Sequence, residues 1–149
     1  MKTIIIAEAG VNHNGKLSIA KKMVKKASEA GADYIKFQTY ITENFVTKNA
    51  PKANYQKINT KKKENQFKML KKFELSLEHF KVLKKECNKN KIKFLSSAFD
   101  TQSIKNLLKL GVSSFKIPSG EITNLPYLKF IGGLRKKIIL SSGMSSKKE

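Results

Sequence analysis

The sequence predicts a TIM-type β/α barrel, of which these 149 residues supply the N-terminal portion, about five β/α units. Short apolar segments alternate with segments of helical periodicity, which is the pattern of parallel strands joined by right-handed crossovers. Lysines and serines recur at the strand ends, where barrel enzymes bind their substrates. An open doubly wound sheet is the alternative, but the glycine-rich dinucleotide fingerprint expected after its first strand is absent.

Five segments are expected to form strands because they are short, apolar and rich in Ile and Phe. They are Thr3–Ala9, Asp33–Thr39, Ile92–Ala98, Ser113–Pro118 and Lys137–Ser142. Apolar residues at three- and four-residue steps predict helices beginning near Leu17, Leu77 and Ile104. Gly31 and Gly111 then stand where a left-handed helix cap is usual.

The stretch from Tyr40 to Phe73 departs from this pattern, because it is polar, rich in Lys and Asn, and interrupted by Pro51. We expect an excursion over the strand ends, followed by an extra helix near Glu64–Lys72. A closed barrel of this type has eight strands and typically about 250 residues. Residues 1–149 are therefore expected to form one partial barrel domain, without the C-terminal half of the barrel.

The formal net charge is +20, and all of the 31 basic residues except Arg135 are lysines. Interfaces that read nucleic-acid bases favour Arg forks and interleaved aromatic residues, whereas these lysines are scattered in pairs. The charge therefore predicts mainly a solvated surface. A non-catalytic, basic nucleic-acid-binding remnant is the alternative from another functional class.

Residues Met1–Glu8 lack the pattern of a signal peptide, and no apolar stretch approaches the roughly 20 residues of a membrane-spanning helix. Cys87 is the only cysteine, which excludes an internal disulfide framework and favours a reducing compartment. We expect a cytoplasmic protein without membrane contacts, in which Cys87 is a buried structural thiol.

Two lysines interrupt apolar strands, where an uncompensated charge would cost several kcal/mol. Lys36 shares a strand face with Gln38, so it is expected to point into the barrel, and Lys116 interrupts the fourth strand. The structural alternative is that these lysines pair with Glu8 or Glu121 only to hold the strands together. The cluster of two lysines and two acids favours a site for a phosphate or carboxylate.

Hydroxyl groups lie at the same level of the predicted barrel. Ser96 and Ser97 lie at the carboxyl end of the third strand, Ser119 directly after the fourth, and Ser141 and Ser142 at the carboxyl end of the fifth. Each serine alone could be a helix cap or a turn residue, and only their recurrence at strand ends favours a functional role.

Metal binding within the chain is not expected. His13, flanked by two Asn and a Gly, is expected to shape its loop by local hydrogen bonds. With one further, distant histidine and a single cysteine, the sequence predicts no complete metal site.

Five motifs give the chain a resemblance to the sialic acid synthase family, in the family's order. They are IAEAGVNHNG at 6–15, IKFQ at 35–38, FLSSAFD at 94–100, FKIPSGEITNLP at 115–126 and ILSSGM at 139–144. The segment APKANYQ at 50–56 is most similar to the legionaminic-acid-type branch.

The resemblance implies an N-acetylneuraminate-type synthase, which condenses phosphoenolpyruvate with an N-acetylated aminosugar such as N-acetylmannosamine and releases phosphate. A legionaminic or pseudaminic acid synthase is the alternative within the family. The resemblance also implies a divalent metal, Mn or Mg, and a homodimer. In the family, the metal-binding histidines and a small antifreeze-like domain come after the point that corresponds to Glu149.

The family's functional residues carry over to matching positions of this chain. Those that would hold phosphoenolpyruvate are Lys36, Ser97, Lys116, Ser119 and Ser141. Glu8, Gln38 and Asn54 would face the sugar, and Glu121 would handle protons beside the reacting carbons. Because the metal ligands lie beyond Glu149, activity of this polypeptide alone is not expected.

Overall fold

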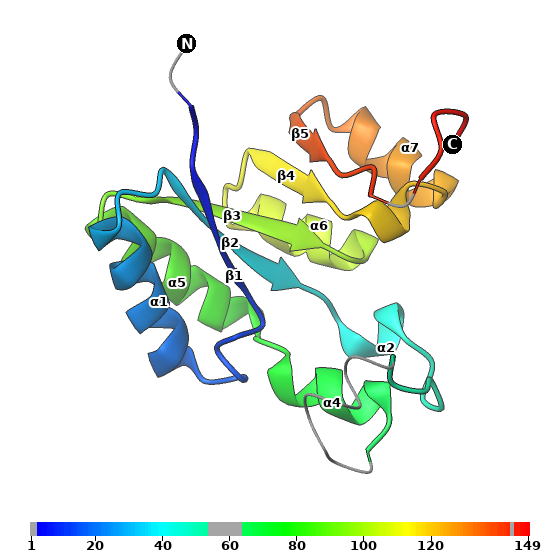
Figure 1. Cartoon of the computed structure of the whole chain (residues 1–149), viewed down its shortest axis with the longest axis horizontal. Coiled ribbons are helices and arrows are strands. Elements are labelled where there is room, and N and C mark those ends of the chain that lie inside the picture. Colours follow the sequence, from blue (N-terminus) through cyan, green and yellow to red (C-terminus); the bar gives the residue numbers. More distant parts are fainter. Residues whose placement is uncertain (1–2, 54–63, 144) are drawn as a thin grey trace.

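The computed structural model describes residues 3–53, 64–143 and 145–149. Its strands form one parallel five-stranded sheet in the order β1-β2-β3-β4-β5 (Figure 1). They are β1 (Ile6–Gly10), β2 (Tyr34–Thr39), β3 (Lys93–Ala98), β4 (Ser114–Ile117) and β5 (Lys137–Leu140). Because each strand pairs with its neighbour in sequence and the order never reverses, the sheet is wound as in a β/α barrel.

Helices cover one face of this sheet, on which Ile35, Phe37 and Phe115 are fully or almost fully buried. They are α1 (Leu17–Glu29) and α5 (Leu77–Lys89) on the β1–β3 side, and α6 (Thr101–Lys109) and α7 (Leu125–Gly133) on the β3–β5 side. Since side chains alternate along a strand, the residues between these apolar ones point to the opposite face. That face carries Lys36 and Lys116.

The described part of the excursion after β2 contains the helices α2 (Thr42–Phe45) and α4 (Gln66–Phe73). Figure 1 shows both beyond the carboxyl end of β2. Tyr40, Met69 and Leu70 form a separate small core between them. The predicted excursion and its extra helix are thereby confirmed for the described residues.

The element boundaries differ from the sequence-based ones at several strand ends. β1 begins at Ile6, and Ile4 and Ile5 before it are 62% and 54% exposed. The sequence patterns did not predict α2, α7 or the 3₁₀ turn η1 (Ser119–Glu121). The start of α7 carries a recognisable signal, because the Asn124 side chain accepts a hydrogen bond from the Tyr127 backbone amide.

Cys87 lies in the core between α5 and the sheet and is fully buried. Burial, together with the neighbouring Glu86, raises the pKa of its thiol to about 12. A thiol that stays protonated is a poor nucleophile, which confirms the prediction of a buried structural cysteine.

β1 and β5 form the two edges of the sheet. In β5, Ile138, Ile139 and Leu140 are between 39% and 52% exposed. These apolar residues lie where the sixth strand of a closed barrel would pair. Among the described helices, none combines the length and apolar composition that a membrane crossing requires.

Candidate active site

Five of the predicted site residues lie on the sheet face that the helices leave open: Glu8, Lys36, Gln38, Ser97 and Lys116. The strand register places Glu8 beside Lys36, Gln38 beside Ser97, and Ser97 beside Lys116. Side chains of paired residues in a parallel sheet point to the same face, so four successive strands, β1 to β4, contribute to one polar surface.

Lys36 is the best-paired charge on this surface. Its Nζ lies 2.5 Å from Glu8 Oε2 and 3.4 Å from Ser97 Oγ. The Lys36 side chain is 15% exposed, whereas that of Glu8 is 51% exposed. The ion pair between Lys36 and Glu8 that the structural alternative predicts is therefore formed. Because half of the Glu8 side chain is exposed, a ligand can still reach the pair.

Lys116 lacks such a carboxylate partner among the described contacts and donates from Nζ to the Ile117 backbone oxygen at 2.9 Å. Burial, and then the positive charge of Lys36, lower the pKa of Lys116, while Glu8 acts in the opposite direction. The two ammonium groups are therefore close enough to repel each other. An anion bound between them would relieve that repulsion.

The Ile117 carbonyl oxygen also accepts from the Ser141 backbone amide at 3.1 Å, which brings the end of β5 beside Lys116. The loop that follows passes close to Ser119, because a Cβ built on Gly143 would lie 3.8 Å from Ser119 Oγ. Ser119 and Ser141 thus follow the paired strands β4 and β5, as the sequence predicts.

Gly10 is a part of the site that the sequence patterns did not single out. A register shift separates Glu8 from Gly10, whose φ is +52°. A Cβ at Gly10 would lie 3.3 Å from Glu8 Oε1 and 3.8 Å from Gln38 Nε2. Because glycine has no Cβ, the Glu8 and Gln38 side chains can both occupy the space beside Gly10. The sequence feature that could have identified Gly10 is its position inside the first motif.

Glu121 and Asn54 are not joined to this surface by the described contacts. Glu121 lies in η1 and accepts from Asn124 Nδ2 at 2.6 Å, which turns its carboxylate toward the start of α7. Its role beside the reacting carbons stays a prediction. Asn54 falls outside the described residues.

His13 is completely buried, and its Nδ1 accepts from the Gly15 backbone amide at 3.0 Å. Its ring centre lies 6.2 Å from that of Phe37, and Nε2 has no hydrogen-bond partner among the residues that the structure describes. The residue shapes the loop after β1, as predicted. No three His, Cys, Asp or Glu residues within the described ranges are grouped so as to hold a metal ion.

Burial lowers the pKa of His13 below that of an exposed histidine, about 6.5. Above pH 6.5 or so both states are neutral, and below it the unfolded chain binds the proton more readily. We therefore expect the free energy of unfolding of the full-length protein to fall as pH drops from about 6.5 to 5. Urea titrations at several pH values measure this dependence.

The matched comparison uses His13→Phe, which keeps a ring in the core and removes the titrating group. His13→Phe should lose this component of the pH dependence, and His79→Gln in α5 should retain it. Equal slopes for the wild type and His13→Phe would contradict the assignment.

Sequence comparisons and structure comparisons with known proteins place this chain beside the same group of enzymes. The NeuB family model matches residues 23–149. The N,N'-diacetyllegionaminic acid synthase of Campylobacter jejuni is 52% identical over 145 residues, which are 97% of this chain and 43% of that protein. The Legionella pneumophila protein of the same name is 48% identical over 100% of this chain and 42% of its own length.

Among solved structures, the N-acetylneuraminic acid synthetase of Leptospira borgpetersenii, crystallised with citrate, superimposes with a TM-score of 0.83 and 32% identity. The match covers 99% of this chain and 47% of that one. The predicted partial β/α barrel is confirmed. This chain spans less than half the length of each of these relatives.

Proposed function

Because this chain belongs to the NeuB family, we propose that it forms the phosphoenolpyruvate-binding strand ends of a nonulosonic acid synthase. The observation that carries the proposal is the placement of Lys36 and Lys116 around Ser97 on the open face of the sheet: Lys36 Nζ lies 3.4 Å from Ser97 Oγ, and Ser97 pairs with Lys116. Phosphoenolpyruvate carries a phosphate and a carboxylate, so two neighbouring cations suit it better than they suit a neutral sugar.

The names of the relatives limit the candidates for the second substrate, the sugar. N,N'-diacetyllegionaminic acid carries two N-acetyl groups, and phosphoenolpyruvate contains no nitrogen. Both groups must therefore come from the sugar. We propose a di-N-acetylated hexose as the preferred acceptor, ahead of N-acetylmannosamine.

The proposed reaction begins when the methylene carbon of phosphoenolpyruvate attacks the aldehyde carbon of the open-chain sugar. The aldehyde oxygen takes up a proton and becomes a hydroxyl. Water then adds to the adjacent carbon of the former phosphoenolpyruvate and loses a proton. The bond from that carbon to the bridging oxygen breaks, so phosphate leaves with the bridging oxygen. The proton of the new hydroxyl passes to the phosphate, and a ketone remains.

Each predicted site residue has a proposed role in this scheme. The residues proposed to hold phosphoenolpyruvate are Lys36, Ser97, Lys116, Ser119 and Ser141. Glu8 and Gln38, which share the space beside Gly10, would bind the sugar hydroxyls. Glu121 is proposed as the carboxylate that transfers the proton to the aldehyde oxygen. Asn54 is proposed as a further sugar contact.

A divalent metal ion, Mn or Mg, is part of the proposal for the full-length protein. The described residues do not form a site for it, so no step above passes through it. A cytoplasmic location and a homodimer also stay predictions.

The test is an assay of phosphate release by the full-length protein with phosphoenolpyruvate, Mn²⁺ and candidate sugars. We expect turnover with an N-acetylated aminosugar, and the highest kcat/KM with the di-N-acetylated hexose. In ¹⁸O-labelled water the label should enter the sugar acid and not the released phosphate. No phosphate release with any aminosugar, or label in the phosphate, would contradict the proposal.

A Glu8→Gln substitution tests the electrostatic coupling in the site. Glu8 raises the pKa of Lys116, so removing its charge should lower that pKa further. The affinity for phosphoenolpyruvate should then decline at a lower pH in the variant than in the wild type, because Lys116 loses its proton earlier. Calorimetric titration of phosphoenolpyruvate across alkaline pH measures this shift, and a shift to higher pH would contradict the coupling.

A further inference from the structure

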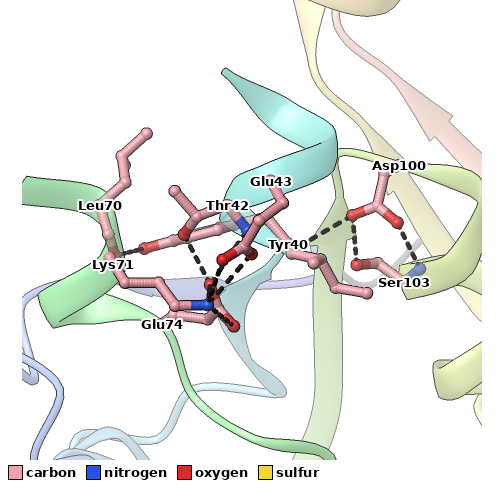
Figure 2. Close-up of polar contacts among 9 residues, drawn as sticks. Tyr40, Thr42, Glu43, Leu70, Lys71, Glu74, Asp100 and Ser103 are labelled. Atoms are coloured by element: carbon pink, nitrogen blue, oxygen red, sulfur yellow. Dashed lines mark hydrogen bonds and ion pairs between the residues drawn. The ribbon is translucent and has the colours of Figure 1, made fainter. Parts of the chain in front are cut away.

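The chain leaves β2 through three consecutive residues that are each held by a different partner (Figure 2). Tyr40 Oη donates to the Leu70 backbone oxygen at 3.1 Å. The Ile41 amide donates to Asp100 Oδ2 at 3.0 Å, and the Thr42 amide donates to Glu74 Oε2 at 3.0 Å. We name Tyr40, Ile41, Thr42, Glu74 and Asp100 the β2 exit clamp.

Glu74 directly follows α4 and links the end of the excursion to Thr42 at its beginning. Its Oε2 accepts from both the amide and, at 2.6 Å, the hydroxyl of Thr42, which is completely buried. Lys71 Nζ lies 3.2 Å from both carboxylate oxygens of Glu74 and also pairs with Glu43 of α2. The carboxylate therefore fixes the beginning of α2 against the end of α4.

Asp100 joins β2 to the end of β3. Its side chain caps α6, accepting from the Ser103 amide at 2.8 Å and from the Ser103 hydroxyl at 2.6 Å. The oxygen that accepts from the hydroxyl also accepts from Ile41. Asp100 and Ser103 are 8% and 0% exposed, so water does not replace these bonds easily.

The clamp lies directly beyond the sugar side of the proposed site. Gln38 precedes Tyr40 by two residues on β2 and pairs with Ser97 on β3. Between them, Thr39 Oγ1 lies 2.7 Å from Ser96 Oγ, and the Thr39 carbonyl accepts from the Phe99 amide. Lys36 is farther from the clamp along β2 and Lys116 lies on another strand, so the clamp restrains Gln38 more directly than either lysine.

We propose that Glu74 and Asp100 are positioning residues that set Gln38, and with it the aminosugar side of the site, without touching substrate. The inference rests on the proposed function. Both carboxylates are buried enough to be costly to leave incompletely paired, which favours one arrangement of the strand exit.

The experiment compares full-length wild type with Glu74→Ala, with the conservative Glu74→Gln, and with Thr42→Val. Glu78→Ala is the matched control, because the Glu78 side chain on α5 is 75% exposed and only pairs with Lys81 at 3.7 Å. Steady-state kinetics give KM for each substrate. Hydrogen exchange of the peptide containing residues 40–46 reports on the clamp itself.

Loss of the charged hydrogen bonds in Glu74→Ala should raise KM for the aminosugar by about tenfold and leave KM for phosphoenolpyruvate within about twofold. Residues 40–46 should exchange about tenfold faster. Glu74→Gln, which can still accept from Thr42, should recover most of both effects. Thr42→Val should repeat the sugar effect at a smaller size, and Glu78→Ala should match the wild type.

The inference is overturned if both KM values rise together, if neither changes, or if exchange of residues 40–46 stays as in the wild type. A wild-type protein without any turnover would instead refute the proposed function, and the positioning role would fall with it. The wild-type assay therefore separates the two failures.

Discussion

Replacing Lys116 with methionine is expected to lower kcat/KM for phosphoenolpyruvate by about 10²–10³-fold. Among the described contacts the Lys116 ammonium bonds to Ile117 O and has no carboxylate partner, so of the two site lysines it is the more available to an anion. Methionine keeps the length and apolar character of the side chain. The loss should therefore come from charge and not from packing.

The control for this experiment is Lys81→Met on α5, where the lysine side chain is 55% exposed. Its kcat/KM and melting temperature should equal those of the wild type. A Lys116→Met variant that folds normally and keeps wild-type kcat/KM would remove Lys116 from the site. A parallel loss in Lys81→Met would point to the overall positive charge instead.

Gly15→Ala is expected to destabilise the full-length protein by about 2–5 kcal/mol, the sum of a left-handed backbone penalty and a steric overlap. Gly15 has a φ of +73°, and a Cβ there would overlap the backbone oxygen of Lys72 at the end of α4. The alanine would push the loop after β1 away from α4. Chemical denaturation measures the loss in the free energy of unfolding.

Gly31→Ala separates the two contributions. Gly31 has a similar φ of +80°, but a Cβ there would meet nothing within 4 Å. This variant should lose only the backbone penalty, about 1–2 kcal/mol. Equal losses for Gly15→Ala and Gly31→Ala would show that the packing of the loop against α4 does not contribute.

Periodicity was enough to predict the alternating strands and helices, because Leu17, Leu77 and Ile104 begin clear apolar faces. The lysines in β2 and β4 were also predictable, since a charge in a buried parallel strand needs a compensating group. The helix α7 was missed because its apolar residues do not form a single clear stripe, although Asn124 marks its start.

The contacts that assemble the site could not be predicted from the pattern. Gly10 matters because it is bare next to Glu8 and Gln38, which depends on a register shift in β1. Asp100 stands inside a family motif, but its bond to Ile41 spans 59 positions and arises only when β2 and β3 pair. Such non-local hydrogen bonds leave no periodic trace in the sequence.

The proposed function requires one anion to lie between the ammonium groups of Lys36 and Lys116. A crystal structure of the full-length protein with phosphoenolpyruvate tests this directly. We expect both Nζ atoms within about 3 Å of oxygens of the same phosphoenolpyruvate molecule. Phosphoenolpyruvate bound elsewhere, with Lys36 still paired to Glu8 and Lys116 still bonded to Ile117 O, would contradict the proposed function.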